Sequence, residues 1–299
     1  MKRVRFLLEA AAFASILRIA GLLPRRLLLA AGSAAGRLGY VLDGRHRRIA
    51  MDNLRPVFGR SLPESEIRRI ARACWRHFGR ILFDALAFSK LSADSAGSVV
   101  YYEGLEHLRA AYARGRGVIL FSGHFGHWEL VALMQGYLGM PLALVTRPLD
   151  NPILERMLAG LRSGSGNVII HKRSAVKEML RAIQRGIGVA IVIDQDARDL
   201  GVFVPFLGRP ASTTPTLALL ALKTGAAVIP VFSTPLPGGA WRVVYEPEIE
   251  VRDTGERAAD VLRLTAECTA RLETWVRRYP ELWLWMHRRF KTEPPGGIS

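Results

Sequence analysis

The sequence is short of cysteine, with two, Cys74 and Cys268, in 299 residues. They lie far apart in segments with helical periodicity and form no CxxC pair, so neither a disulfide framework nor a cysteine metal site is indicated. Buried thiols in a reducing compartment are expected instead. The chain also lacks internal repeats, long low-complexity tracts and linkers rich in Ser, Gly or Pro, which predicts a single domain over residues 1–299.

Acidic residues are scarce relative to basic ones. Asp and Glu number 26 against 42 Lys and Arg, for a formal net charge of +16. A positive field attracts polyanions, which include nucleic acid, anionic lipid and an acidic carrier protein. The charge does not choose among them, and a proteome rich in arginine would produce it with no function attached.

A long apolar run without charges is also missing. A basic leader at residues 2–5 precedes the apolar stretch Phe6 to Leu23, but Glu9 and Arg18 interrupt it. No charge-free run reaches the roughly 18–20 residues that a spanning helix needs. We expect a shallow membrane anchor within residues 1–31, with its basic end on the cytoplasmic side. The alternative is an ordinary buried helix of a soluble protein.

Residues 1–100 are expected to be mostly helical. The clearest helix runs from Glu64 to Ser89, where apolar side chains recur at the spacing of one buried face. Ser61-Leu62-Pro63-Glu64 has the spacing of a capping box, with Pro63 in the first turn. Five arginines lie away from the apolar stripe and predict a solvated basic face or a docking face for something acidic: Arg68, Arg69, Arg72, Arg76 and Arg80.

Residues 101–299 alternate short apolar runs with helical periods. The predicted strands are Val118–Phe121, Leu142–Thr146, Val168–Ile170, Val189–Ile193, Val228–Phe232 and Trp241–Tyr245. The predicted helices are His127–Leu138, Pro152–Arg162, Ser174–Arg185 and Thr214–Thr224. This alternation predicts an α/β fold, with a central, largely parallel sheet flanked by helices and an N-terminal helical region that associates with a membrane. Ligands of such sheets collect at the carboxyl ends of the strands.

The segment after the first predicted strand carries the best candidate chemistry. His124 falls in the strand-to-helix turn and Glu129 in the first turns of the helix. A glutamate there would accept the imidazole N–H and fix its tautomer, leaving the other nitrogen free to take a proton from an alcohol. Gly123 and Gly126 would allow the close approach of a substrate.

This segment permits two other interpretations. Ser122 as a nucleophile is disfavoured because the G-x-S-x-G elbow is absent. A zinc site at His124, His127 and Glu129 is disfavoured because H-E-x-x-H and a further ligand are both missing. We therefore expect neither a metal nor a cofactor.

Further polar clusters follow other strands. Arg147 follows the second strand, Arg162 closes the next helix, and Asp194-Gln195-Asp196 ends an apolar strand. Residues 201–208 form an apolar segment that neither helix nor strand periodicity explains, and it is expected to be a loop that walls a hydrocarbon slot or covers the core. Tryptophans among arginines between residues 275 and 291 suit a membrane interface or stacking on nucleic-acid bases.

Six motifs together resemble the bacterial lipid A late acyltransferases, within the wider lysophospholipid acyltransferase superfamily. In chain order they are His124-x4-Glu129, Arg147 to Pro152, Asp194-Gln195-Asp196, Gly201 to Phe206, Gly225 to Pro230, and Trp283-x-Trp285-Met286-His287-Arg288-Arg289. Each motif alone is weak, but six in family order across nearly the whole chain are specific.

The resemblance implies an acyltransferase at the cytoplasmic face of the bacterial inner membrane. It implies an acyl-carrier-protein thioester, or acyl-CoA, as the donor and a lipid A precursor as the acceptor, with His124 and Glu129 as the catalytic pair. The substrate contacts are expected at Arg147, Arg162, Asp194, Gln195, Asp196, Gly201, Phe203 and Pro205. Other acceptors stay open at this point: a glycerophospholipid, a phosphatidyl-inositol mannoside or an ornithine lipid. The non-enzyme alternative is a basic nucleic-acid-binding protein, which no recognised nucleic-acid module supports.

Overall fold

The structure is a computed structural model and describes residues 2–146, 148–171 and 175–295. The helices are α1 (Lys2–Leu22), α2 (Arg25–Leu42), α3 (Gly44–Phe58), α4 (Glu64–Ala85), α5 (Ala93–Ala96), α6 (Leu105–Ala113), α7 (Trp128–Tyr137), α8 (Pro152–Ser163), α9 (Ala175–Gln184), α10 (Thr216–Thr224) and α11 (Arg257–Arg278). The strands are β1 (Val100–Glu103), β2 (Val118–Ser122), β3 (Leu142–Thr146), β4 (Val168–His171), β5 (Gly188–Val192), β6 (Val202–Phe206), β7 (Arg209–Thr213), β8 (Ala227–Pro235) and β9 (Trp241–Tyr245). Arg147 lies outside the described residues.

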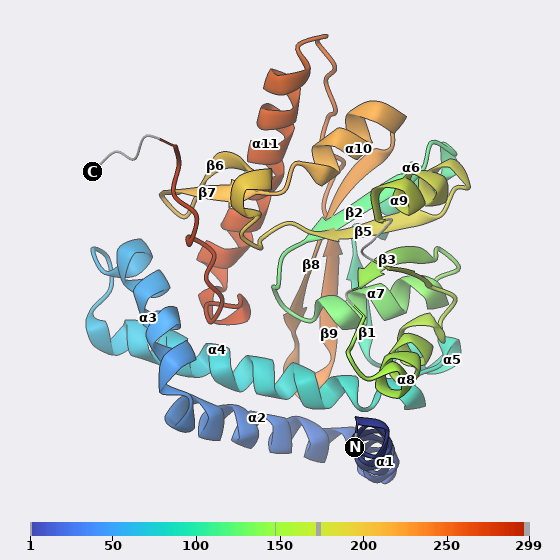
Figure 1. Ribbon diagram of the computed structural model, residues 1–299, viewed down its shortest axis with the longest axis vertical. Coiled ribbons are helices and arrows are strands. Elements are labelled where there is room, and N and C mark those ends of the chain that lie inside the picture. The colour runs from blue at the N-terminus through green and yellow to red at the C-terminus, as the bar shows by residue number, and fades with distance from the viewer. Residues whose placement is uncertain (1, 147, 172–174, 296–299) are drawn as a thin grey trace.

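A seven-stranded sheet forms the centre of the molecule, in the order β1-β9-β8-β2-β5-β3-β4 (Figure 1). The five strands from β8 to β4 are parallel, β9 is antiparallel to β8, and β1 is parallel to β9. The predicted α/β class with a largely parallel sheet is confirmed. The six predicted strands are present, whereas β1 at the sheet edge was not predicted.

The central strand β2 is apolar because both of its faces are covered. Ile119 and Phe121 belong to a core with α9, α10 and α11. Val118 and Leu120 point the other way, into a core with α6 and α7. A strand buried on both faces has no solvated side, so its sequence reads as a continuous apolar run.

Helix α2 packs closely against α4, and Figure 1 shows the two running side by side along one edge of the molecule. The contact depends on glycine, because a Cβ at Gly36 would lie 2.2 Å from the carbonyl oxygen of Trp75. A Cβ at Gly79 would likewise lie 2.3 Å from the oxygen of Gly32. The two backbones therefore approach to a distance that no larger residue permits.

Two local predictions are wrong. Pro63 is the N-cap of α4 without a side-chain cap, and Ser61 donates instead to the oxygen of Phe58 at 3.1 Å, so it closes the turn after α3. The segment 201–208 is not a loop, because β6 pairs with β7 as an antiparallel hairpin. Proline at position 205 removes a backbone donor and hides the strand from sequence patterns.

The N-terminal helices are present as expected, and none of the helices in the described ranges is long and apolar enough to cross a membrane. Helix α1 is fastened to the start of α8 by Asn151. The side-chain amide of Asn151 donates to the oxygen of Phe6 and to Glu9 Oε2, both at 2.9 Å, while its own oxygen caps α8.

We predict that Gly36→Ala lowers the free energy of unfolding by about 1–3 kcal/mol, because the new methyl group overpacks the contact between α2 and α4. Gly160→Ala in α8 is the matched control, since a Cβ there meets no atom within 4 Å. It should be neutral or stabilise by up to about 1 kcal/mol, because alanine is the better helix former. Urea unfolding followed by circular dichroism measures both. Equal stability of Gly36→Ala and the unmodified chain would contradict the close approach.

Candidate active site

The turn between β2 and α7, residues 123–127, presents His124 at the carboxyl edge of the sheet. Each of its two glycines is required by a close protein contact, a reason that the sequence did not reveal. Gly126 has a φ of +58°, and a Cβ there would lie 2.1 Å from the oxygen of Ser233. A Cβ at Gly123 would lie 2.9 Å from Asp194 Oδ2. The turn is thus pressed against the core, and this fixes the position of the histidine.

Asp194 follows β5, the neighbour of β2, and holds His124 at two points. Asp194 Oδ2 accepts the backbone N–H of His124 at 2.7 Å, and Oδ1 accepts Nδ1 at 2.8 Å. With Nδ1 as the donor, the neutral imidazole carries its lone pair on Nε2. Nε2 has no hydrogen-bond partner among the described residues. The arrangement leaves one ring nitrogen available to act as a base.

The pKa values of this pair move apart. Burial by itself would raise the pKa of Asp194, but the charge of His124, its two hydrogen bonds and the charge of His287 hold that pKa well below its usual range. Burial opposes the protonation of His124, yet the charge and hydrogen bond of Asp194, with the charge of Glu129, raise the pKa of His124 above its usual value. Asp194 therefore remains a carboxylate while the imidazole changes its charge.

Glu129 is in the first turn of α7 but does not orient the imidazole, so the predicted hydrogen bond is wrong. Its carboxylate is held bidentately by Arg162 from the last turn of α8, with Nε–Oε2 at 3.0 Å and Nη2–Oε1 at 2.7 Å. About a third of each side chain is exposed. The sequence placed His124, Glu129 and Asp194 near one edge of the sheet. Only the pairing differs, because Asp194 rather than Glu129 lies beside Nδ1 of the imidazole.

The C-terminal segment closes the back of the site. Trp283 is fully buried and donates its indole N–H to Asp194 Oδ2 at 2.7 Å. The backbone of Leu284 donates to the oxygen of His124 at 3.1 Å, and Gly126 donates to Leu282 at 2.9 Å. His287 Nε2 lies 2.9 Å from the oxygen of Asp194. The segment thus supports both the histidine and its carboxylate.

This arrangement corrects the assignment of the C-terminal tryptophans to a membrane interface or to base stacking. Trp275, Trp283 and Trp285 are buried, and Arg289 is 1% exposed. Arg289 donates to the oxygens of Gln195 and Ser212 and to Thr213, and burial lowers its pKa to about 10. Trp283, His287 and Arg289 were not assigned to the site from the sequence. The W-x-W-M-H-R-R motif that contains them was the signal that could have identified them.

The remaining predicted contacts fall into two groups. Gln195 uses its carbonyl for Arg289, and Asp196 accepts from Thr292 and from the backbone of Arg198, so both lie beside the site without facing His124. On the β6–β7 hairpin, Phe203 and Pro205 are on the more exposed face, while Val204 and Phe206 are buried. Gly201 precedes β6, and its missing Cβ makes room for Ser212 Oγ on β7.

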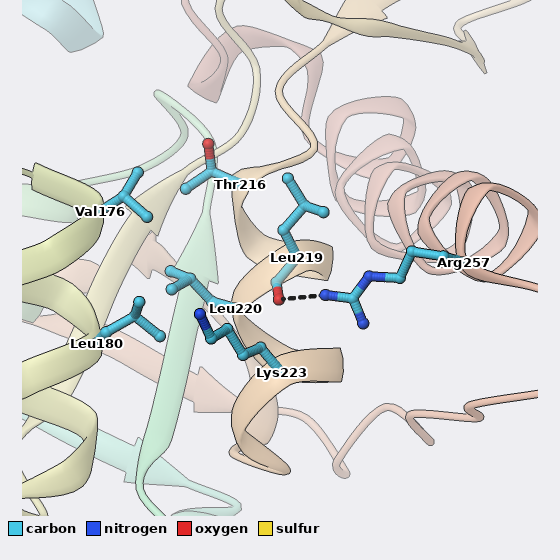
Figure 2. Close-up of a pocket in the computed structure, with 7 residues that line it drawn as sticks. All are labelled: Val176, Leu180, Thr216, Leu219, Leu220, Lys223 and Arg257. Atoms are coloured by element: carbon cyan, nitrogen blue, oxygen red, sulfur yellow. Dashed lines mark hydrogen bonds between the residues drawn. The ribbon is translucent and has the colours of Figure 1, made fainter. Parts of the chain in front are cut away.

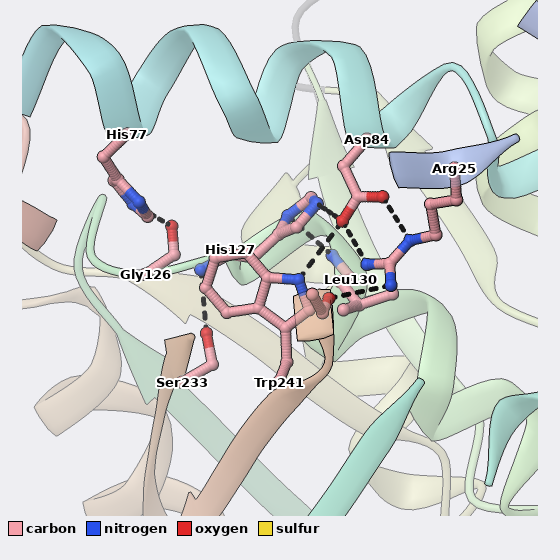
Figure 3. A network of polar contacts seen from close by, with 9 residues as sticks. Arg25, His77, Asp84, Gly126, His127, Leu130, Ser233 and Trp241 are labelled. Atoms are coloured by element: carbon pink, nitrogen blue, oxygen red, sulfur yellow. Dashed lines mark hydrogen bonds and ion pairs between the residues drawn. The ribbon is translucent and has the colours of Figure 1, made fainter. Parts of the chain in front are cut away.

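A second buried network lies on the other side of the turn (Figure 3). His127 caps α7, since its Nδ1 accepts the N–H of Leu130, which leaves the proton on Nε2, 3.6 Å from Asp84 Oδ2. Asp84 on α4 also accepts Arg25 bidentately, at 2.6 and 2.5 Å, and the indole N–H of Trp241 at 3.2 Å. Burial lowers the pKa of His127 to about 4, so its ring is neutral near pH 7. The network joins α2 and α4 to the first turn of α7.

A shallow apolar groove lies elsewhere, between α9 and α10 (Figure 2). Its lining residues are Val176, Leu180, Thr216, Leu219, Leu220, Lys223 and Arg257. None of them belongs to the 123–127 turn, so the groove is separate from His124. Within the ranges that the structure describes, no group of three or more His, Cys, Asp or Glu side chains is placed to hold a metal ion.

Comparison with known proteins identifies the family and several relatives of the chain. The family described as bacterial lipid A biosynthesis acyltransferase matches residues 2–292. The chain is 29% identical over 281 residues to the lipid A biosynthesis palmitoleoyltransferase of Escherichia coli (strain K12), covering 93% of this chain and 89% of that protein. It is 31% identical over 199 residues to the lauroyltransferase of the same organism, covering 64% and 62%. It is 24% identical over 237 residues to a phosphatidylinositol mannoside acyltransferase of Mycolicibacterium smegmatis, covering 77% and 75%.

We predict that Asp194→Asn lowers the pKa of His124, because the variant removes the negative charge that raises it. A pH titration of the imidazole Cε1–H signals by NMR measures the shift, with the His124 signal assigned from a His124→Gln variant. Asp196→Asn is the control: it removes the same charge nearby but makes no contact with the imidazole, and should leave the His124 titration almost unchanged. An unaltered His124 pKa in Asp194→Asn would contradict the pairing.

Proposed function

The chain belongs to the bacterial lipid A biosynthesis acyltransferase family, and we propose that it transfers a fatty acyl chain from an acyl-carrier-protein or coenzyme A thioester to a hydroxyl group of a lipid A precursor. The observation that carries the proposal is the His124 imidazole at the sheet edge, which a buried carboxylate orients and whose Nε2 is not bonded to any residue that the structure describes. A base without a nucleophilic side chain suits direct transfer between two substrates.

The proposed reaction has two proton movements at one nitrogen. Nε2 of His124 removes the proton of the acceptor hydroxyl as its oxygen attacks the thioester carbonyl. The tetrahedral intermediate then collapses, the carbon–sulfur bond breaks, and the protonated imidazole returns the proton to the leaving thiolate. Asp194 stabilises the imidazolium between these events and keeps Nε2 directed at the substrates.

Glu129 and Arg162 are proposed to act as a unit beside the base. Glu129 adds negative charge near His124, which raises its pKa, and fixes the guanidinium through Nε and Nη2. Nη1 of Arg162 takes no part in that ion pair, so it is available to a substrate phosphate or to the phosphopantetheine of the donor. Arg147 stays a predicted contact of the same kind, and Phe203 and Pro205 stay predicted contacts of the acyl chain.

A second acceptor class is supported by one observation. The similarity to the phosphatidylinositol mannoside acyltransferase of M. smegmatis extends over most of both chains. The same base could deprotonate a hydroxyl group of a phosphatidylinositol mannoside. The assay below therefore compares the two acceptor lipids. Family membership identifies the chain as an acyltransferase and so decides between the enzyme and the non-enzyme interpretation.

We further propose that α1 and α2 lie in the cytoplasmic surface of the inner membrane. Ten of the nineteen exposed large apolar side chains of the described residues belong to these two helices, which lie within residues 2–42. On α2 they are Leu27, Leu38, Val41 and Leu42, exposed by 56–72%. Helix α2 has Gly32 and Gly36 against α4 and these four apolar residues outward, as expected for an interfacial helix. The anchor predicted within residues 1–31 would then continue to Leu42.

The catalytic assignment predicts that His124→Gln reduces kcat/KM by roughly 10²–10⁴, because the general base is removed. Glu129→Gln should reduce it by roughly 10–100-fold, the loss of one charged hydrogen-bonded pair. Transfer from a labelled acyl thioester of acyl carrier protein, followed by mass spectrometry of the lipid, measures both variants with a lipid A precursor and with a phosphatidylinositol mannoside.

Glu178→Gln is the matched control for Glu129→Gln, because it breaks another Arg–Glu pair, with Arg181 on α9, away from the turn. It should retain activity within twofold. Near-normal turnover of a folded His124→Gln variant would refute the base assignment, and transfer to the mannoside alone would replace the proposed acceptor.

The membrane assignment predicts that Leu38→Glu together with Val41→Glu shifts the protein from sedimenting vesicles to the supernatant, since two apolar contacts with the bilayer are replaced by two charges. Leu262→Glu on α11 is the control, because Leu262 is 45% exposed on a helix far along the chain, and it should not alter sedimentation. Unchanged partition of the double variant, with intact circular dichroism, would place the membrane contact elsewhere.

A further inference from the structure

Arg80 is the arginine of α4 that is partly enclosed, and it forms no ion pair with an acidic residue that the structure describes. Arg68 and Arg69 are exposed and pair with Glu64 and Glu66. Arg80 is half-buried, its Nε is fully buried without a hydrogen-bond partner, and no ion pair joins it to a carboxylate within the described residues. The predicted basic face of α4 is therefore exposed to solvent and paired with glutamates at its beginning. At Arg80 it is partly enclosed and has no such ion pair.

The nearest carboxylate is already engaged. Asp84 lies one turn after Arg80 on α4, where it accepts Arg25 bidentately and also Trp241 (Figure 3). Arg25 uses Nε and Nη2 for this pair, the same edge through which Arg162 holds Glu129. Asp84 is thus bonded to Arg25, and Arg80 forms no ion pair with it among the described residues, although the charge of Asp84 still acts on Arg80.

A second and a third cation stand close to Arg80. A Cβ built on Gly239 would lie 3.9 Å both from Arg25 Nη1 and from Arg80 Nη2, so the two guanidinium groups border the same point of the Pro237–Gly239 turn. Arg76 lies one turn before Arg80 and is exposed. Burial is the main cause that lowers the pKa of Arg80. The charge of Asp84 opposes this change, and the charges of Arg25 and Arg76 lower the pKa further. Three cations thus face one carboxylate.

The position of this cluster indicates the kind of anion. Arg76 and Arg80 flank the contact between α2 and α4, since a Cβ at Gly36 or Gly32 would lie 2.9 Å from the Cα of Arg76 or Arg80. The outward face of α2 carries the exposed apolar residues that we assign to the membrane surface. Phosphate is the anion found at that depth, and arginine binds it through two parallel N–H groups.

We propose that Arg80, assisted by Arg76, binds the phosphate group of a lipid. The phosphate would accept from the terminal Nη1 and Nη2 groups of Arg80, which are not among the fully buried atoms, and it would balance the local excess of positive charge. The inference rests on the proposed function for the source of that phosphate: a phosphorylated acceptor lipid or a phospholipid of the surrounding bilayer.

Calorimetric titration of the full chain with dihexanoyl phosphatidic acid, a short-chain lipid phosphate, tests the proposal. Arg80→Gln should weaken binding about tenfold or more, the loss of a charge-assisted pair. Arg80→Lys keeps the charge and the aliphatic stem but lacks the bidentate edge, and it should also weaken binding; it remains available if Arg80→Gln does not fold. Arg69→Gln removes the same charge from an exposed position of α4 and should bind within twofold of the unmodified chain.

Equal binding by all variants, or an equal loss in Arg69→Gln and Arg80→Gln, would overturn the proposal. Titration with inorganic phosphate separates the two possible ligands: weaker binding than that of the lipid supports a lipid phosphate, and equal affinity would assign the site to free phosphate instead. A second titration with dihexanoyl phosphatidylcholine, expected to bind more weakly, shows whether a net negative headgroup is required. No arm uses acyl transfer, so a negative result would leave the proposed function standing.

Discussion

The buried carboxylate of Asp194 is the interaction on which the active edge of the sheet depends. An ionised carboxylate with 1% exposure would be very unfavourable without partners. Here it accepts two hydrogen bonds from His124 and one from Trp283, which come from segments far apart in sequence. The β2–α7 turn, the end of β5 and the C-terminal segment must therefore all be in place before this charge is satisfied, so the fold and the site are assembled together.

A second buried carboxylate, Asp84, does the same on the opposite side of the turn. It ties α2 through Arg25, β9 through Trp241, and the cap of α7 through His127. The turn carrying His124 is thus held between two buried acids, one behind the imidazole and one behind the helix that carries Glu129. Since Arg25 begins α2, the helix that we assign to the membrane surface is joined by an ion pair to Asp84, whose Oδ2 in turn lies 3.6 Å from Nε2 of His127 in the turn.

The two ion pairs of the edge differ in their surroundings, and this suits different roles. Asp194 and His124 are enclosed, so the charge of one strongly affects the proton affinity of the other. Glu129 and Arg162 are each about one third exposed, so water screens their attraction and substrate groups have access to Arg162. The enclosed pair sets the orientation and basicity of the imidazole, whereas the exposed pair offers hydrogen bonds at the surface.

The sequence by itself determined the elements and the edge at which chemistry gathers. Apolar runs such as Val118–Phe121 are buried on both faces and predict strands, and parallel strands place the residues that follow them, His124 and Asp194, at the same edge. It did not determine which acid faces the imidazole, because two acids are close enough in such a topology and the choice depends on the path of the turn around Gly123 and Gly126. Nor did it show that Trp283 and Arg289 are buried. Aromatic and cationic residues occur together both at a membrane surface and in a buried network, so the composition of the segment does not distinguish the two. Only tertiary packing, which brings the C-terminal segment behind β5, gave those side chains their partners.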